Sequence, residues 1–234
     1  YPDLANFSKS PVICNRRNRC VHKNFISISC FFHDFFRGIS SSRKFDCIVD
    51  VGCNDLFLLN EMKSFGKFRV GLDPIWKNKK PVTDDHNLMV IGETVETANL
   101  DKELTSKPDL IVSRHTLEHM SNPALALSKL YDCSSDNALF VFEFPCLDFL
   151  VSRGRFDQIF HEHLNYFSRS SLSILFHKIG FKVVEWGQSY HNWGSLLVAF
   201  RKDTKKQNKK LKLTINRREF KSRRDLFFSQ MKNT

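Results

Sequence analysis

The sequence lacks any long hydrophobic run. None of its apolar stretches approaches the roughly 18 residues that a membrane-spanning helix needs, although the overall hydrophobic fraction is an ordinary 41%. The segment from Tyr1 to Cys14 also lacks the charged stretch followed by an apolar stretch that marks a signal peptide. These absences predict a protein without a membrane span or secretory leader, and we expect it in the cytoplasm.

Closely spaced cysteine pairs are also missing. The chain has seven cysteines, an odd number, and no Cys-x2-Cys pair. The early metal-ligating side chains surround a basic run that would repel a cation; they are Cys14, Cys20, His22, Cys30 and His33. Three later cysteines fall on or beside expected buried strands: Cys47, Cys53 and Cys146. We therefore expect reduced thiols, no disulfide framework and no metal site.

Net charge is nearly absent from most of the chain and concentrated at its end. The formal net charge is +11, and residues 201–234 hold 13 Lys/Arg against 3 Asp/Glu, which leaves +1 for the preceding residues. A nearly neutral body argues against a nucleic-acid groove there. The tail is expected to be a solvated helix or linker. Nonspecific contact with RNA, DNA or an acidic membrane surface is the alternative.

A chain of 234 residues is long enough for one domain with a full core. We expect residues 1–44 to form a helical cap, residues 45–200 an α/β domain and residues 201–234 a basic helical tail. The aromatic segment from Phe25 to Phe36 predicts a helix packed across the sheet. Its side chains would pack in the core, or would line a ligand pocket, for which the candidates are Phe31, Phe32 and Phe35.

The most informative stretch begins with a strand. Residues 47–51 form a short apolar run typical of a strand buried on both faces. Gly52 to Asp55 favour a turn, and Leu56 to Met62 have apolar residues at helical spacing. Phe68 to Leu72 predict a second strand, with Asp73 at its end. A strand, turn, helix and strand with a terminal acid is typical of the nucleotide-binding half of a doubly wound fold.

The turn resembles the first motif of class I S-adenosylmethionine-dependent methyltransferases, Asp/Glu-x-Gly-x-Gly/Asn-x-Gly. Here it is Asp50-Val51-Gly52-Cys53-Asn54-Asp55-Leu56. The resemblance implies a Rossmann-like class I methyltransferase fold that binds S-adenosyl-L-methionine. In it the turn would pass beneath the methionine part, and the terminal acid would accept hydrogen bonds from the ribose. The implied cofactor contacts of this region are Asp50, Gly52, Cys53, Asn54, Asp73 and Pro74.

The sequence of this turn differs from two known glycine patterns. Leu56 stands where the methyltransferase motif usually has its last glycine, and we expect this side chain to narrow the pocket. A dinucleotide site is less compatible with the sequence, because only Gly52 of the Gly-x-Gly-x-x-Gly pattern is present. An αβ unit with an incidental acid at Asp73 is the alternative without a ligand.

The next two predicted strands, residues 88–91 and 110–112, also end in candidate contacts. The resemblance places Glu93 and Thr94 beside the adenine. Arg114 and His115 would lie at the switch point where ligands bind in open α/β sheets. His115 is expected near the amino-acid end or the methyl group of the cofactor. We expect the following His119 to cap a helix or to pack.

A second motif follows the predicted fifth strand, residues 138–144. After a short spacer comes His161-Glu162-His163-Leu164-Asn165-Tyr166-Phe167, which resembles the C-methyltransferases that act on nucleotide-linked keto sugars. In that family the pair matching Glu162 and His163 sits over the methyl group. Carbon methylation needs a base to remove an acidic proton beside a carbonyl, and imidazole titrates near neutral pH. His163 is the predicted base, assisted by Glu162, and His161 is the alternative base.

The remaining pattern completes the predicted sheet. Helices are expected over residues 97–105, 124–131 and 168–178, the last ending at Gly180. Residues 181–186 and 195–200 predict the last two strands, which the resemblance makes an antiparallel edge pair. The expected fold class is therefore α/β, with a mostly parallel seven-stranded sheet and an antiparallel edge strand.

We predict an S-adenosylmethionine-dependent methyltransferase that methylates a carbon of a nucleotide-linked keto sugar or a related small metabolite. A small-molecule O-methyltransferase with a histidine base is one alternative. A methyltransferase-fold binding module without catalysis is another, motivated by Leu56 and by Phe160, where relatives often carry Tyr. A methyltransferase tethered to RNA through the tail is the third. The predicted partner is a small-molecule acceptor, with nucleic acid contacted only through the basic tail.

Overall fold

The structure is a computed structural model that describes residues 26–40, 43–81, 84–155, 158–189 and 194–204, with positions 225, 228 and 229. Cys14 and Cys20, the side chains of Cys30 and Phe31, and the conformation expected for the basic tail lie outside the described part of the chain. Within the described part, no helix has both the length and the apolar character needed to cross a membrane.

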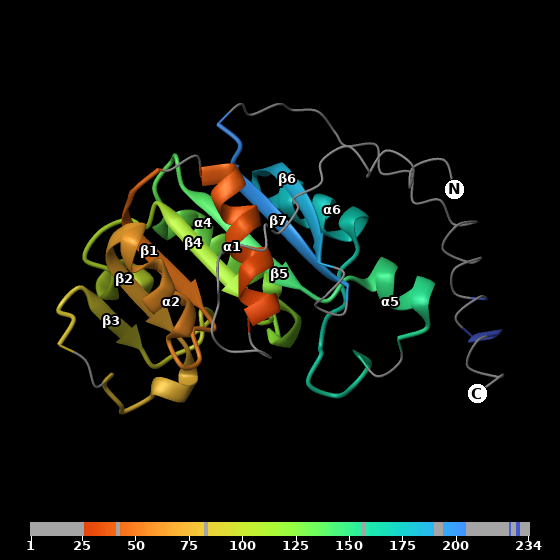
Figure 1. Ribbon diagram of the computed structural model, residues 1–234, viewed down its shortest axis with the longest axis horizontal. Coiled ribbons are helices and arrows are strands. Elements are labelled where there is room, and N and C mark those ends of the chain that lie inside the picture. Colours follow the sequence, from red (N-terminus) through yellow and green to blue (C-terminus); the bar gives the residue numbers. More distant parts are fainter. Residues whose placement is uncertain are drawn as a thin grey trace.

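One seven-stranded sheet forms the centre of the molecule (Figure 1). Its strands are β1 (Phe45–Val51), β2 (Gly66–Leu72), β3 (Leu88–Ile91), β4 (Leu110–Arg114), β5 (Leu139–Phe144), β6 (Phe181–Ser189) and β7 (Ser195–Lys202). Their spatial order is β3-β2-β1-β4-β5-β7-β6. The first five strands are parallel, and β7 pairs antiparallel with both β5 and β6. The predicted α/β fold and its antiparallel edge pair are confirmed.

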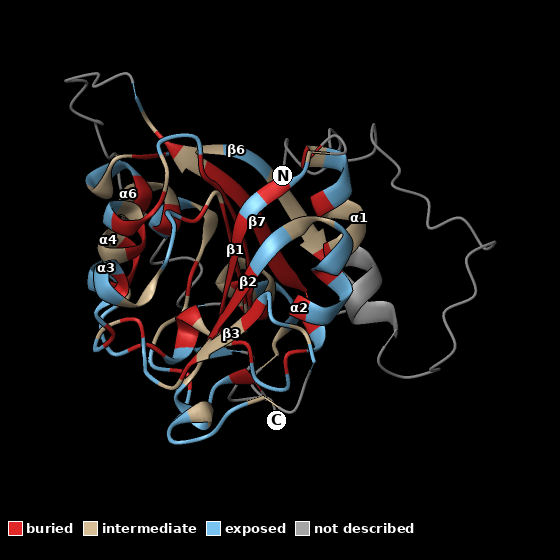
Figure 2. Ribbon diagram, turned by 90° about the vertical axis from the view of Figure 1, so that its left-hand side faces the viewer, coloured by how far each residue is buried: buried red, intermediate tan, exposed pale blue. Residues whose placement is uncertain are grey.

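Helices cover both faces of the sheet (Figures 1 and 2). One face carries α1 (Ile26–Ser40) and α2 (Phe57–Glu61), and the opposite face carries α3 (Leu100–Glu103), α4 (Pro123–Cys133) and α6 (Arg169–Ile179). Three 3-10 helices are η2 (Met62–Ser64), η3 (Pro74–Trp76) and η4 (Leu117–His119). Because both faces are covered, the central strands β4 and β5 are apolar almost throughout and buried.

The boundaries of the two best-predicted helices follow from their caps. Asn122 accepts a hydrogen bond from the backbone of Leu125 at the start of α4, and Pro123 occupies the first helical position. Ser168 and Ser171 form a reciprocal capping box at the start of α6. That helix ends at Gly180, whose φ of 106° lies in the left-handed region that glycine tolerates.

Two other helices differ from the sequence prediction. The helix expected over residues 97–105 is only the short α3. Just before it, the Lys129 ammonium donates to the backbone carbonyls of Val95, Glu96 and Ala98. Beyond β5, the expected spacer contains a helix, α5 (Leu147–Arg153).

The packed body extends past both expected domain boundaries. Phe32 and Phe36 of α1 are 1% and 0% exposed and join the core against the sheet, so α1 belongs to the domain. At the other end, β7 runs through Lys202, whose ammonium donates to the carbonyl of Ser134. The described body therefore runs from residue 26 to residue 204, with gaps.

Candidate active site

A cavity of about 670 Å³ opens at the carboxyl ends of β1 to β4. Ligands of open α/β sheets bind at this edge, and the volume lies within the range usual for small-molecule sites, roughly 300–1,000 Å³. Eight of the ten predicted cofactor contacts line it: Gly52, Asn54, Asp73, Pro74, Glu93, Thr94, Arg114 and His115. Other lining residues come from the ends of β3 and β4, among them Glu96, Thr97, Thr116, His119 and Met120.

The turn after β1 brings bare backbone to the cavity wall. Gly52 has a φ of 80°, and a Cβ there would lie 1.9 Å from Thr116 Oγ1, so a side chain would displace the loop after β4. Asn54 also has a positive φ, of 42°. Its backbone amide donates to Asp73 Oδ2 over 3.0 Å, and Ile75 donates to Asp73 Oδ1 over 2.9 Å. These bonds fix the carboxylate at the tip of β2 and leave it lone pairs for a ligand.

Leu56 does not narrow this cavity, so that expectation was wrong. Its backbone is left-handed, with a φ of 65°, and its side chain is 4% exposed in the core cluster of α1 and α2. The absent side chain of Gly71 makes room, since a Cβ there would lie 3.0 Å from Leu56 and 2.6 Å from Cys53 Sγ. The left-handed turn directs Leu56 into the core instead of the pocket.

Asp50 and Cys53 are the two predicted cofactor contacts that do not line the cavity. Both are buried, at 2% and 3% exposed. Burial raises the pKa of Asp50 to about 7 against the attraction of Arg114, and the nearby Asp73 and Asp55 raise it further. Burial also raises the pKa of the Cys53 thiol. These side chains support the turn from behind its backbone.

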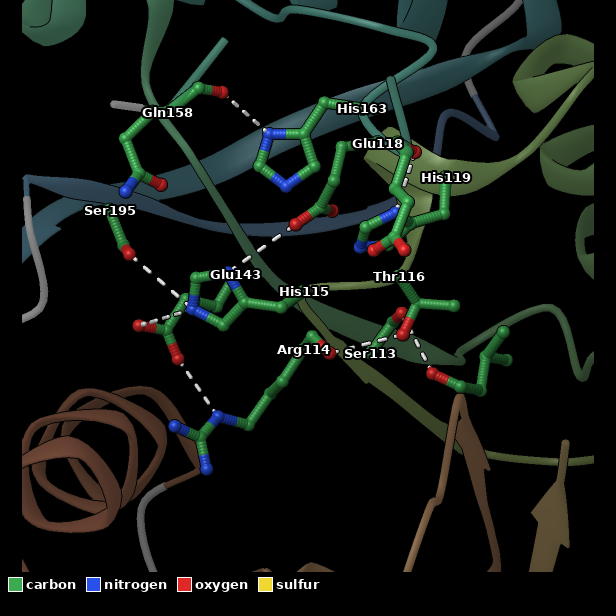
Figure 3. A network of polar contacts seen from close by, with 12 residues as sticks. Ser113, Arg114, His115, Thr116, Glu118, His119, Glu143, Gln158, His163 and Ser195 are labelled. Atoms are coloured by element: carbon green, nitrogen blue, oxygen red, sulfur yellow. Dashed lines mark hydrogen bonds and ion pairs between the residues drawn. The ribbon is translucent and has the colours of Figure 1, made fainter. Parts of the chain in front are cut away.

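Side chains of opposite charge contact one another at the end of β4 (Figure 3). Arg114 Nε donates to Glu143 Oε2 over 2.8 Å, and its guanidinium lies 5.2 Å from the Phe32 ring. His115 lies between two carboxylates, with Nε2 3.7 Å from Glu143 Oε1 and Nδ1 3.4 Å from Glu118 Oε1. Burial opposes its charge, but the two carboxylates outweigh burial and raise the pKa of His115 to about 9. The ring is therefore a cation at neutral pH.

Phe32, an expected pocket residue, thus lies beneath Arg114 and in the core. Phe35 packs against Gly187 of β6, where an added Cβ would lie 2.8 Å from its ring. Neither side chain lines the cavity. Core packing, the alternative role for these aromatic residues, accounts for both.

The chain between β5 and α6 passes over the site and is pinned at both ends. Cys146 and Phe167 form a parallel bridge, and Leu147 donates to the Phe167 carbonyl over 2.8 Å. Near its end, Asn165 donates from its side chain to the Met120 carbonyl over 2.6 Å and from its backbone to the Glu118 carbonyl over 3.0 Å. These bonds hold the second predicted motif against the loop that follows β4.

Two histidines meet where these segments touch. The His119 and His163 ring centroids lie 4.9 Å apart, nearly edge to face. His119 Nδ1 lies 2.7 Å from the Glu162 carbonyl, and His163 Nδ1 lies 3.0 Å from the Gln158 carbonyl. A carbonyl only accepts, so each Nδ1 carries a proton, and in the neutral tautomer that this fixes the lone pair lies on Nε2. Burial lowers the pKa of His163, which keeps that ring neutral at pH 7.

The structure separates the three residues of the predicted catalytic set. His163 is 9% exposed and, although it does not itself line the cavity, it contacts His119, which does. The Glu162 carboxylate and the His161 ring point outward, with side chains 65% and 91% exposed and a closest approach of 3.9 Å to each other. Glu162 supports the site through its backbone carbonyl.

The carboxylate beside the histidine pair is Glu118 instead. Its side chain is 2% exposed, and within the described residues neither oxygen has a hydrogen-bond partner. Its carboxylate does form an ion pair with His115. The expectation that His119 only caps or packs misses its position on the cavity wall. The Leu-Glu-His run directly after a polar strand end was the available signal for both residues.

The residues present fit an adenosyl cofactor. A bare glycine backbone, a fixed carboxylate at the tip of the second strand and polar residues after β3 all face one cavity. Gly52 is needed there because a Cβ would collide with Thr116. This arrangement, on this sheet topology, defines the class I methyltransferase fold.

Comparison with known proteins agrees with that class. The family described as "Methyltransferase domain" matches residues 27–186, so the chain belongs to the methyltransferase-domain family. The C-methyltransferase NovU of Streptomyces niveus is 30% identical over 156 residues, an alignment that spans 65% of this chain and 37% of that protein. The chain thus matches little more than a third of this relative's length.

Two solved structures illustrate the shared fold. The N-methyltransferase NodS from Bradyrhizobium japonicum WM9, in complex with S-adenosyl-l-homocysteine, gives a TM-score of 0.57 at 12% identity and covers 77% of this chain and 89% of its own. Magnesium protoporphyrin IX methyltransferase (ChlM) from Synechocystis PCC 6803, with bound SAH, also gives 0.57 at 12% identity and covers 79% and 90%. The described residues therefore form a methyltransferase domain with the fold of these structures.

Proposed function

We propose that this domain methylates a carbon atom next to a carbonyl group in a small acceptor, a nucleotide-linked keto sugar or a related metabolite. The observation that carries the proposal is the pair of histidines at the cavity, each with Nδ1 tied to a backbone carbonyl and Nε2 left as an acceptor. The 30% identity with a C-methyltransferase supports the same class of reaction.

The cavity would hold the cofactor by its fixed polar groups. Asp73 would accept from the ribose hydroxyls, because its two backbone bonds leave lone pairs on both oxygens. Glu93 and Thr94 would lie beside the adenine, and the turn at Gly52 beneath the methionine part, as the motif implies. When bound, S-adenosylmethionine supplies an electrophilic methyl group. Everything else in the reaction falls to side chains of this chain.

His163 would act as the base. Its Nε2 would take the proton on the carbon beside the acceptor carbonyl, and the electron pair left behind makes that carbon the nucleophile. The hydrogen bond from Nδ1 to Gln158 fixes the ring orientation, and burial keeps the ring neutral and ready to accept. His119 is the competing base, because it lines the cavity directly and is held in the same tautomer.

The role predicted for Glu162 changes with its position. We propose that its backbone carbonyl orients His119, while the buried Glu118 supplies the negative charge that stabilises a protonated imidazole after proton transfer. The 91% exposure of the His161 side chain makes that residue the least suitable of the three histidines. The proposal therefore retains His163 as base and replaces the carboxylate.

Cofactor binding is tested first by calorimetric titration with S-adenosylmethionine and with S-adenosylhomocysteine. We expect micromolar binding, lost in Asp73→Ala and weakened in Asp73→Asn, because the amide keeps the shape but loses half of the acceptor capacity. Glu103→Gln, a carboxylate change on α3 outside the cavity, is the matched control. Absence of binding at millimolar ligand would favour the noncatalytic module.

The base is tested by proton exchange rather than by product alone. A nucleotide-linked keto sugar is incubated with the protein and S-adenosylhomocysteine in D₂O, and deuterium uptake beside the carbonyl is followed by NMR. His163→Asn should abolish uptake and keep cofactor binding, whereas His161→Asn should change neither. Uptake lost only in His119→Asn would transfer the role of base to His119, and uptake unchanged in both would refute carbon methylation through an enolate.

A further inference from the structure

Three potential metal-ligating side chains meet beside the cavity. Glu118, His119 and His163 each offer one ligand atom, and these atoms all lie within 4.8 Å of one another. Figure 3 shows the carboxylate and the two rings facing one another, with Glu118 and His119 from the loop after β4 and His163 from the segment after α5. The grouping brings together residues 45 positions apart only because the second segment crosses the first.

The carboxylate in this cluster is unusual in its surroundings. Glu118 is 2% exposed on its side chain, and both oxygens are buried without a hydrogen-bond partner within the described residues. A buried carboxylate normally has hydrogen-bond or metal partners, because leaving it unsatisfied costs several kcal/mol. Its ion pair with His115, at 3.4 Å, involves only the oxygen Oε1. Acceptor capacity therefore remains toward the two histidines.

The rings of His119 and His163 are held in orientations suited to metal binding. Each Nδ1–H donates to a backbone carbonyl, of Glu162 for His119 and of Gln158 for His163. Metal-binding histidines characteristically hold their second nitrogen in this way, which sets the tautomer and directs the other lone pair at the ion. Nε2 is therefore the ligand atom that each ring can offer.

We propose that Glu118, His119 and His163 form a site for one divalent transition-metal ion of the Zn²⁺ class. Two imidazoles and one carboxylate suit such ions, whereas Ca²⁺ and Mg²⁺ prefer sets of oxygen ligands. Three protein ligands leave a coordination position open on the cavity side, as in zinc sites that also bind a small molecule. His119 is exposed, which provides a path for the ion.

Binding requires a small contraction of the cluster. Zinc lies about 2.0–2.2 Å from nitrogen and oxygen ligands, so ligand atoms up to 4.8 Å apart must move closer by side-chain rotation. His115 Nδ1 lies 3.4 Å from Glu118 Oε1, so the ion must share that carboxylate with His115. Both factors favour an ion that binds strongly to imidazole over one that relies on charge alone.

A metal ion at this site would block the base. This consequence rests on the proposed function: an ion bound to His163 Nε2 uses the lone pair that would otherwise accept the proton. The protein would then have an active metal-free form and an inactive metal-loaded form. Loading would be reversible by a chelator.

The binding proposal is tested with Co²⁺ as a spectroscopic probe on the full chain. We expect one equivalent to give visible absorption bands that Zn²⁺ displaces. Glu118→Gln, His119→Gln and His163→Gln should each weaken binding at least tenfold, while His161→Gln, a control at a neighbouring 91% exposed ring, should leave it unchanged. Circular dichroism checks that each variant is folded.

Another set of ligands would overturn the proposal. If the three variants bind Co²⁺ like the parent chain, and substitution of Cys14, Cys20 and Cys30 removes the bands, the ion belongs to the N-terminal segment. Inhibition is measured separately, as deuterium uptake by the acceptor with and without Zn²⁺ and EDTA. Uptake unaffected by saturating Zn²⁺ would refute blocking of the base, and a protein that binds Co²⁺ at the triad without any uptake would show that the proposed reaction fails while the metal site stands.

Discussion

Gly52 shows how one residue shapes the cavity wall. Its φ is 80°, and a Cβ added to it would lie only 1.9 Å from Thr116 Oγ1, which leaves no space for any side chain. Thr116 is itself held by a hydrogen bond from its hydroxyl to the Arg114 carbonyl, over 3.0 Å. The turn after β1 and the loop after β4 therefore meet at a position that only glycine can occupy.

Gly52→Ala should abolish most cofactor binding and destabilise the fold by roughly 1–3 kcal/mol, because the new Cβ combines overpacking with an unfavourable φ. Calorimetry and urea unfolding measure the two effects. Gly38→Ala, in α1 with nothing within 4 Å of its Cβ, is the matched control. It should be neutral or stabilise by up to about 1 kcal/mol. Equal behaviour of the two variants would contradict this account of the turn.

Asp50 makes stability depend on pH. Its pKa rises from 3.8 to about 7 on folding, mainly through burial. A raised carboxyl pKa means that the folded state holds a proton that the unfolded state releases, so stability is greatest below the unfolded pKa. It then falls as pH rises from about 4 to about 7, and levels off above that.

Asp50→Asn should remove this dependence. At one pKa unit per about 1.4 kcal/mol, the shift of Asp50 corresponds to at most about 4 kcal/mol, and the variant should gain part of this at pH 8. Urea unfolding of the cofactor-free protein at pH 5.5 and 8 gives the comparison. If the difference in unfolding free energy between the parent chain and the variant is the same at pH 8 as at pH 5.5, Asp50 is ionised in the folded state.

At the scale of elements, the segment between β5 and α6 gains its position from a few long-range bonds. The Cys146–Phe167 bridge joins the two ends of the segment. Near its C-terminal end, the Asn165 side-chain amide donates to the Met120 carbonyl. These contacts place His163 beside His119. Without them, two histidines 44 positions apart would have no common site.

Asn165→Ala should reduce turnover at least tenfold with a loss of stability of only about 1–2 kcal/mol, because the side-chain hydrogen bonds to the Met120 and Glu118 carbonyls are removed while the core is untouched. Steady-state kinetics and thermal unfolding are the paired measurements. Leu164→Ala, at an adjacent side chain that is 59% exposed, should leave both unchanged. A similar loss of turnover in both variants would indicate that the segment is not positioned by Asn165.

At the scale of the whole molecule, most of the net charge lies in residues 205–234 and little of it in the described body. Residues 205–234 hold 11 Lys/Arg against 2 Asp/Glu, while the body is nearly neutral. The sheet ends at Lys202, and Asp203 still donates to the Gly180 carbonyl over 2.7 Å. A truncation that preserves the body must therefore keep residues 201–204.

Deleting residues 205–234 should leave cofactor binding and the thermal midpoint unchanged; if the alternative role as an RNA tether holds, the deletion removes retention on RNA at low salt. Fluorescence anisotropy with a short RNA at several salt concentrations measures this, since each phosphate contact contributes to the slope of affinity against salt. If the truncated and full chains show the same affinity and slope, the tail is not an electrostatic tether. The solvated-linker interpretation then stands.

Much of the architecture was predictable because it depends on local patterns. Short runs of three to seven residues predicted all seven strands, and Gly180 marked the end of a helix. The bonds that fix the chain before α3 were not predictable, since they come from Lys129, more than 30 positions away. Eight of ten proposed cofactor contacts reach the cavity because strand ends meet at one edge of a parallel sheet.

Local patterns in the sequence predict the class of fold, the motif that forms the turn, and the residue types available for the chemistry. Strand periodicity and turn glycines act over short distances, so they can be recognised in the chain. The folded structure was needed to show where Leu56 points, that Glu162 contributes its carbonyl, and that Glu118 and His119 join His163. Those outcomes depend on backbone handedness and on contacts between segments more than 40 residues apart, which no local pattern encodes.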